Sequence, residues 1–168
     1  MKCEKKCEKN HIRMISSQIL FAAIREELAC NRQASFTVTG MSMWPFICHG
    51  RDKVVVGAVK PEELRKGDII LFQPVKDKFI LHRITKRSLE YFETTGDGNL
   101  FRDGRFAYDC VIAKVDKVIR NGKSIDCNNR GWKMLSQMWI FLFPIRKQIF
   151  HTWFRIRKYI RPDAGKTK

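Results

Sequence analysis

A serine in a turn bounded by glycine and proline is the first residue of the chain whose setting suits covalent chemistry. Ser42 lies in the sequence GMSMWP (residues 40–45), directly after the β-branched run FTVT at 36–39. A nucleophilic serine needs a fixed position at an exposed turn, with main-chain N–H groups nearby that stabilise an oxyanion. Gly40 and Pro45 are residue types that build such turns. Alone, the pattern fits either a nucleophile or an ordinary turn residue.

A serine of this kind also needs a general base, and His82 is the best-placed histidine. It follows an apolar run in the sequence LHRI (81–84). In an alternating strand His82 shares a face with Ile80 and Ile84, so its side chain is expected to point inward. The same position would also suit a histidine that only completes the core. His11, His49 and His151 lie in a charged tail, a loop and a basic segment, where we expect them to be solvated.

Two carboxylates in one loop are candidates for orienting that histidine. The sequence TTGDGNLFRDG (94–104) contains Asp97 and Asp103, six residues apart. Aspartates in such loops often accept hydrogen bonds from the local backbone instead. The sequence by itself leaves both roles open for each of them.

The elements that would position these residues are short strands. Segments rich in β-branched and aromatic residues occur at 36–39, 53–56, 68–72, 79–84, 90–95 and 111–119, separated by Gly, Pro, Asp and Asn. The pattern predicts a mainly β fold, a compact antiparallel β-sheet domain over residues 35–127.

Helical periodicity flanks this domain on both sides. Residues 1–34 are predicted to form a tail and one amphipathic helix over 11–30, with Ile12, Ile15, Ile19, Ala22, Ala23 and Leu28 on its apolar side. Residues 128–168 are predicted to form basic amphipathic helices. Their last apolar stripe comprises Ile145, Ile149, Trp153, Ile156 and Ile160, and Pro144 separates it from the preceding apolar segment.

Composition and charge narrow the class of protein. The 168 residues carry 33 Lys and Arg against 17 Asp and Glu, a net charge of +16, with 44% apolar residues. This is the composition of a globular protein with a polyanionic neighbour. Six cysteines form no second close pair that would complete a zinc site, so we expect neither metal nor cofactor. Nucleic acid is an unlikely partner, because no DNA- or RNA-binding motif accompanies the charge.

The C-terminal segment favours an anionic membrane surface as that neighbour. Residues 131–168 hold nine Lys and Arg and one Asp, and the basic groups alternate with bulky aromatics. Such a helix suits the membrane interface, with its basic groups at the lipid phosphates, although it would also suit docking on the core. The basic residues beside the apolar stripe are Arg146, Lys147, Arg155, Arg157, Lys158 and Arg161. Uncharged runs reach only 11 and 12 residues, and the N-terminus has no secretory-signal pattern. We therefore expect peripheral membrane association, with a soluble cytoplasmic protein as the alternative.

Taken together and in order, the motifs resemble those of the signal peptidase I family of serine endopeptidases. The resemblance covers about residues 36–119 and rests on five motifs: GMSMxP at 40–45, RDKVVV at 51–56, KGDIILF at 66–72, LHRI at 81–84 and TTGDGNxxxD at 94–103. Members of the family use Ser with Lys or, in the endoplasmic-reticulum-type branch, Ser with His and Asp. The chain resembles the second branch, without the N-terminal transmembrane anchor. Arg51, Gly98 and Arg102 differ from the family pattern.

The resemblance implies roles for individual residues. Ser42 falls on the nucleophile, His82 on the general base and Asp103 on the carboxylate that orients the base. Asp97, Gly40 and Asn99 fall on supporting positions, and Asp97 is expected to accept backbone hydrogen bonds. Because Gly40 has no side chain, the oxyanion hole is expected to consist of main-chain N–H groups.

The resulting prediction is a serine endopeptidase that removes a leader or signal peptide from a precursor, after small residues if the family's preference holds. One alternative is a protease dedicated to the maturation of a single peptide. Another is a non-catalytic module on the same fold that binds a membrane or a partner. Met41, Met43, Trp44 and Phe46, next to the serine, are expected either to face lipid and substrate or to pack in the core.

Overall fold

The computed structural model describes residues 17–160, without the side chains of Ser17, Phe154 and residues 157–160. The helices are α1 (Ser17–Ala29), α2 (Arg130–Phe141) and α3 (Arg146–Ile160), with a short 3-10 turn at Phe143–Ile145 before α3. The strands are β1 (Ala34–Thr37), β2 (Asp52–Gly57), β3 (Ile69–Val75), β4 (Lys78–Arg87), β5 (Tyr91–Thr95), β6 (Gly104–Ala107), β7 (Val111–Arg120) and β8 (Lys123–Asp126).

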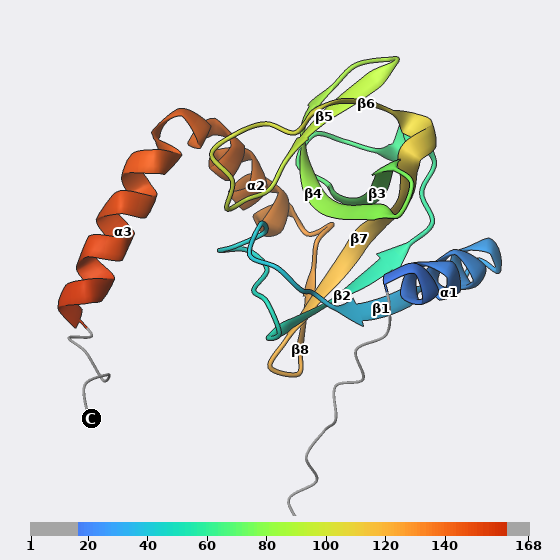
Figure 1. Ribbon diagram of the computed structural model, residues 1–168, viewed down its shortest axis with the longest axis horizontal. Coiled ribbons are helices and arrows are strands. Elements are labelled where there is room, and N and C mark those ends of the chain that lie inside the picture. The colour runs from blue at the N-terminus through green and yellow to red at the C-terminus, as the bar shows by residue number, and fades with distance from the viewer. Residues whose placement is uncertain (1–16, 161–168) are drawn as a thin grey trace, which may run out of the picture.

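The eight strands form one antiparallel sheet. Its order is β1-β2-β7-β3-β4-β5-β6, and β8 pairs with β7 beside this path. The sheet coils so that β3, β4, β5 and β6 form a curved roll, while β1 and β2 extend toward α1 (Figure 1). The predicted mainly β fold with helices at both ends is confirmed.

Register within the roll places the candidate residues near one another. His82 of β4 lies opposite Ile70 of β3, and Thr94 of β5 lies opposite Gly104 of β6. Since Asp103 directly precedes Gly104 and its N–H donates to the carbonyl of Thr94 at 3.0 Å, the loop after β5 returns alongside its own strand. The hairpin thus brings Asp103 back to the end of the roll where His82 lies.

Two apolar clusters fill the two sides of the sheet. The smaller lies inside the roll and comprises Leu64, Ile70, Phe72, Ile84 and Phe92. The larger spans α1, β1, β2, β3 and β7, and it also includes Met43, Phe46, Trp139 and Phe150. Of the apolar residues around Ser42, Met43 and Phe46 are therefore core residues, whereas Met41 is 61% exposed.

Helix α1 packs on the large cluster with a different face from the one its sequence suggests. Ile24 and Leu28 are buried and Leu20 and Phe21 pack against the cluster, whereas Ile19 is 65% exposed. The prediction was wrong for Ile19, Ala22 and Ala23. The ring of Phe21 stacks on Phe79, with 3.9 Å between the ring centroids, so the larger aromatic side chain lies on the buried side in place of Ala22 and Ala23. Residues 11–16 of the predicted helix lie outside the described residues.

The C-terminal helices begin on the core. Asn129 caps α2 by accepting the N–H of Gly131, and Trp139 and Phe150 pack in the large cluster. The C-terminal turns of α3 extend away from the sheet (Figure 1). No helix between residues 17 and 160 combines the length and the apolar character needed to cross a membrane.

Candidate active site

Ser42 lies in a compact turn that leaves the end of β1. Gly40 adopts a φ of +89°, a conformation open to glycine and rarely to other residues, and its N–H donates to His49 Nδ1 at 3.0 Å. The N–H of Trp44 donates to the carbonyl of Met41 at 3.1 Å and closes the turn around Ser42. Gly40 thus has the supporting position that the sequence predicts, through its backbone conformation.

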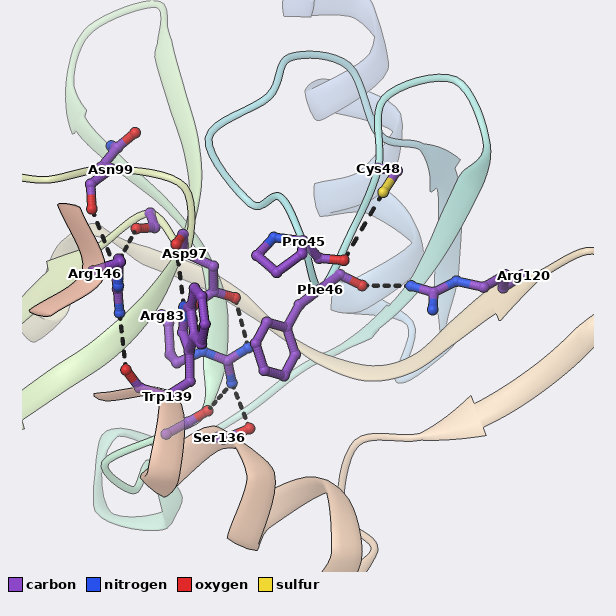
Figure 2. Close-up of polar contacts among 12 residues, drawn as sticks. Pro45, Phe46, Cys48, Arg83, Asp97, Asn99, Arg120, Ser136, Trp139 and Arg146 are labelled. Atoms are coloured by element: carbon purple, nitrogen blue, oxygen red, sulfur yellow. Dashed lines mark hydrogen bonds and ion pairs between the residues drawn. The ribbon is translucent and has the colours of Figure 1, made fainter. Parts of the chain in front are cut away.

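A buried carboxylate anchors the far end of this turn. Asp52 accepts hydrogen bonds from the N–H of Cys48 and from the guanidinium groups of Arg51 and Arg120. Arg120 also donates to the carbonyl of Phe46 at 2.6 Å (Figure 2). Burial by itself would raise the pKa of Asp52, but these hydrogen bonds outweigh it and hold the pKa well below its ordinary value. Arg51, which differs from the family pattern, thus supplies a second cation to this anchor.

His82 and Asp103 form a hydrogen-bonded pair. Nδ1 of His82 lies 2.5 Å from Oδ2 of Asp103, and the two side chains are 9% and 10% exposed. The same carboxylate oxygen accepts the hydroxyl of Thr94 at 2.8 Å. Two neighbours therefore fix Asp103, and with Nδ1 engaged, Nε2 is the ring nitrogen of His82 left for proton transfer.

Ser42, His82 and Asp103 line one cleft of about 670 Å³. Its walls come from the end of β1, the β3–β4 hairpin, α1 and the loop after β5. Among the other predicted residues, Asn99 lines the cleft as well, whereas Asp97 does not. Apolar groups dominate the α1 side, where Leu20, Phe21 and Phe79 lie. The cleft thus joins a serine, a histidine and an aspartate to an apolar surface.

No hydrogen bond links Ser42 to His82 within the described part of the chain. Nucleophile and base often approach each other only when substrate is bound, so this geometry is compatible with the pair acting together. The main-chain N–H groups of Ser42 and Met43 likewise have no acceptor among residues 17–160. Unpaired main-chain donors of this kind are what the predicted oxyanion hole would require.

Asp97 has a different partner from the one predicted. Its two carboxylate oxygens accept Nε and Nη2 of Arg83 at 2.8 and 2.7 Å, and both residues are almost completely buried (Figure 2). The expectation that Asp97 accepts backbone hydrogen bonds in its turn was wrong. The reason is that Arg83, inside a buried strand next to His82, needs a carboxylate to compensate its charge. Nη1 of Arg83 donates to the hydroxyl of Ser136 and the carbonyl of Gly67, and the guanidinium lies over the ring of Phe46.

Glycines in the loop after β5 permit direct contact with the backbone of Ser42. The N–H of Gly98 donates to the carbonyl of Ser42 at 2.7 Å. A Cβ atom at Gly96 would lie 2.5 Å from that carbonyl oxygen, and one at Gly98 would lie 2.9 Å from the carbonyl of Met41. Gly98, which departs from the family pattern, thus occupies a place where a side chain would separate the loop from the serine turn.

Several residues that hold the site are absent from the sequence prediction. They are Thr94, Arg83, Ser136, Trp139, Arg146 and Asp52 with Arg120. Arg83 was recognisable in principle, because an arginine in the middle of an apolar strand requires a buried acid. Arg146 was grouped with the other basic residues of the C-terminal helix, but it is 1% exposed and lies under the loop after β5. Arg102, in contrast, points toward Glu93 and the Phe143 ring.

Comparison with known proteins adds no family: no family model and no curated protein sequence matches the chain. The resemblance to signal peptidase I therefore rests on the five motifs. Within residues 17–160, no cluster of His, Cys, Asp or Glu side chains is arranged to hold a metal ion.

Proposed function

We propose that the protein is a serine endopeptidase, resembling signal peptidase I, that cleaves a leader peptide from a precursor. The observation that supports this best is the single cleft lined by Ser42, His82 and Asp103, with Nδ1 of His82 2.5 Å from the carboxylate. A non-catalytic binding module would have no use for a buried histidine held by a carboxylate at the mouth of a cleft. A protease dedicated to one maturing peptide would use the same site.

Acylation would begin with attack of Ser42 Oγ on the scissile carbonyl carbon. His82 Nε2 takes the hydroxyl proton, and Asp103 holds the imidazole in the required tautomer and stabilises its charged form. The carbonyl oxygen becomes an oxyanion that accepts hydrogen bonds from main-chain N–H groups of the serine turn. Collapse of the tetrahedral intermediate breaks the C–N bond, and His82 passes its proton to the leaving amine.

Deacylation would reverse these roles with water as the nucleophile. His82 takes a proton from water while the oxygen attacks the ester carbonyl, and it then returns the proton to Ser42 Oγ as the ester bond breaks. The products are two peptides, one with a new carboxylate and one with a new amine. Neither step calls for a cofactor.

The substrate we propose is an extended peptide with an apolar stretch. Residues 36–39 border the cleft, and β1 lies at the end of the sheet, where an additional strand is able to pair. The wall that carries Leu20, Phe21 and Phe79 would contact the apolar side chains of that peptide. Leader peptides have this character.

Peripheral attachment to an anionic membrane would bring such substrates to the cleft. Ile145, directly before α3, and Trp153 and Ile156 on α3 are about half exposed. Lys147 and Arg155 of the same helix are exposed. Met41 and Phe101, close to the site in the chain, are 61% and 65% exposed. Apolar groups that enter the interface, with cations near the lipid phosphates, are the usual features of such a surface.

Peptide cleavage by purified protein tests the proposal. A mixture of synthetic leader-like peptides, each with an apolar stretch followed by small residues, is incubated with wild-type protein, Ser42→Ala or Ser124→Ala, and the products are read by mass spectrometry. Ser124 is an exposed serine of β8, so its variant controls for the substitution itself. We expect cleavage by wild type and Ser124→Ala and none by Ser42→Ala. Equal turnover by Ser42→Ala, with unchanged circular dichroism, would exclude Ser42 as the nucleophile.

A further inference from the structure

Arg146, the first residue of α3, is buried beneath the loop that follows β5. Its Nη1 donates to the carbonyls of Gly96 and Asn99, both at 3.2 Å, and its Nη2 donates to the carbonyl of Trp139 at 3.2 Å (Figure 2). The guanidinium also lies over the rings of Trp139 and Phe143, at 4.9 and 5.0 Å from their centroids. A planar group with five donors is the one side chain suited to all of these contacts.

Burial of a cation at this position costs free energy. The contacts of Arg146 with the loop must compensate that cost. Burial lowers the pKa of Arg146 below its ordinary value, although the nearby Asp97 carboxylate partly opposes this effect. Nε of Arg146 is buried and has no hydrogen-bond partner among residues 17–160. An exposed cation on α3 would avoid both penalties.

The loop held by Arg146 is the loop that contacts Ser42. The carbonyls of Gly96 and Asn99 bracket Asp97 and Gly98, and the N–H of Gly98 donates to the carbonyl of Ser42 at 2.7 Å. This hydrogen bond fixes the peptide plane between Ser42 and Met43. Because no side chain separates the two backbones, a shift of the loop moves the backbone that carries Oγ.

A second contact from the C-terminal helices acts on the same loop. Nε1 of Trp139 donates to the carbonyl of Asp97 at 3.1 Å, and the indole ring stacks with Arg146. Three carbonyls of the loop therefore take their hydrogen bonds from α2 and α3. Without them, the carbonyl of the buried Asp97 would lose its hydrogen bond from Trp139, and the carbonyl of Gly96 would keep only the N–H of Asn99.

We propose that Arg146 is a positioning residue for Ser42, acting through the loop 96–99, so that the start of α3 belongs to the catalytic apparatus. This inference rests on the proposed peptidase function. It assigns to Arg146 a role unlike that of Lys147 and Arg155, which are exposed and suited to lipid phosphates.

Lys147 provides the matched control. It follows Arg146 in the same helix and carries the same charge, but its side chain is exposed. Arg146→Met and Lys147→Met therefore remove equal charge from α3, and only the first removes the contacts with the loop. Arg146→Lys keeps the positive charge but lacks the two Nη groups that donate to the carbonyls. It replaces Arg146→Met in the experiment if that variant fails to fold.

The experiment measures how fast and how completely a peptide-linked fluorophosphonate labels Ser42 in the full-length proteins. We expect Arg146→Met and Arg146→Lys to lower the limiting labelling rate about 100-fold, the effect of a nucleophile misplaced by about 1 Å, while the final stoichiometry stays at one label per chain. Partial unfolding would instead lower the stoichiometry, and Lys147→Met should label like wild type. Equal rates for the folded Arg146 variants and Lys147→Met would overturn the proposal.

Hydrogen exchange separates this inference from the proposed function. In the Arg146 variants the amide of Gly98 should exchange faster than in Lys147→Met, while amides of β3 and β7 keep their protection. If wild-type Ser42 does not label at all, the peptidase proposal fails, and the Gly98 amide still reports whether Arg146 holds the loop. Unchanged Gly98 exchange in the variants would overturn the positioning role by itself.

Discussion

Asp103 and Asp97 lie six residues apart in one loop, yet their partners give them different tasks. Asp103 accepts Thr94 and lies against His82 at the cleft, where its charge would stabilise the imidazolium of a proton-transfer step. Asp97 does not line the cleft and forms a buried ion pair with Arg83. A substitution that removes charge but keeps shape should therefore affect the reaction in one case and the fold in the other.

We predict that Asp103→Asn lowers kcat/KM by about 10⁴-fold with little loss of stability, because the amide favours the wrong tautomer of His82. Asp97→Asn should instead lower the free energy of unfolding by about 3–5 kcal/mol, the usual cost of removing one partner of a buried ion pair. Peptide cleavage and urea unfolding of both variants measure the two effects. If Asp97→Asn cleaved no peptide while Asp103→Asn cleaved at the wild-type rate, Asp97 and not Asp103 would be the carboxylate that supports His82.

Asp52 gives a prediction for the pH dependence of stability. Its pKa is depressed in the native protein, so its contribution is present above the ordinary aspartate pKa of about 3.9 and is lost as the pH falls below it. We expect the free energy of unfolding to fall between about pH 4 and pH 2, and Asp52→Asn to make this decline shallower. Asp109, an exposed aspartate, supplies the control variant Asp109→Asn. Parallel acid profiles for wild type and Asp52→Asn would contradict this role.

At the scale of elements, the sequence predicts those whose patterns are strong and local. The apolar, β-branched segments at 53–56, 79–84 and 111–119 lie in strands, and those at 68–72 and 90–95 do so except for their first residues. The segment at 36–39 lies in a strand only as far as Thr37. Strands β6 and β8 were missed, because GRFA and KSID are short and polar and owe their conformation to pairing with β5 and β7. Only the neighbouring strand, not the segment itself, determines that they are strands.

The same reasoning explains what was predictable in the candidate site. Ser42, His82 and Asp103 each belong to a motif with local character, so their types and order are readable. Arg146 is 50 residues from the Gly96 carbonyl it binds, and its segment has the composition of a solvated basic helix. Nothing local distinguishes it from Lys147, and only the packing of α3 against the loop separates the two residues.

Membrane attachment through α3 is a prediction at this scale. We expect Trp153→Ser, and the pair Lys147→Gln with Arg155→Gln, each to weaken binding to anionic vesicles. The cations should contribute about 1 kcal/mol each at low salt and less as salt rises. The double variant Lys60→Gln with Lys123→Gln, which removes equal exposed charge outside α3, is the control in a vesicle sedimentation assay. Equal losses from both double variants would assign the effect to net charge instead of to α3.

Considered as a whole molecule, the protein is held together by its C-terminal helices as well as by its sheet. Trp139 and Phe150 pack in the large apolar cluster, and Arg146 and Ser136 reach the loop and strand beside the site. Removing residues 131–168 would therefore take away core and site along with any lipid-binding surface. Point substitutions on the exposed side of α3 are for this reason the proper test of membrane binding.

The charged residues of the molecule divide into those that form ion pairs near the site and those that are exposed. Asp97 forms a buried ion pair with Arg83, and the buried carboxylate of Asp52 pairs with the more exposed Arg51 and Arg120. Many of the remaining cations are exposed. A net charge of +16 would attract an anionic surface, and this attraction would weaken with salt. The ion pairs of Asp52 and Asp97, in contrast, stabilise the serine turn and the strand that carries His82.

The central claim is that His82 activates Ser42, and the rate at which Ser42 is labelled tests it most directly. A peptide-linked fluorophosphonate is reacted with wild type, His82→Gln and His49→Gln, and the adduct is mapped by mass spectrometry. His49 is another histidine close to the serine turn in the sequence; its side chain is exposed and accepts a hydrogen bond from the N–H of Gly40. The account predicts labelling at Ser42 in wild type and His49→Gln, and a rate lowered by about 10²–10⁴-fold in His82→Gln. Labelling of Ser42 at the wild-type rate in His82→Gln would contradict it.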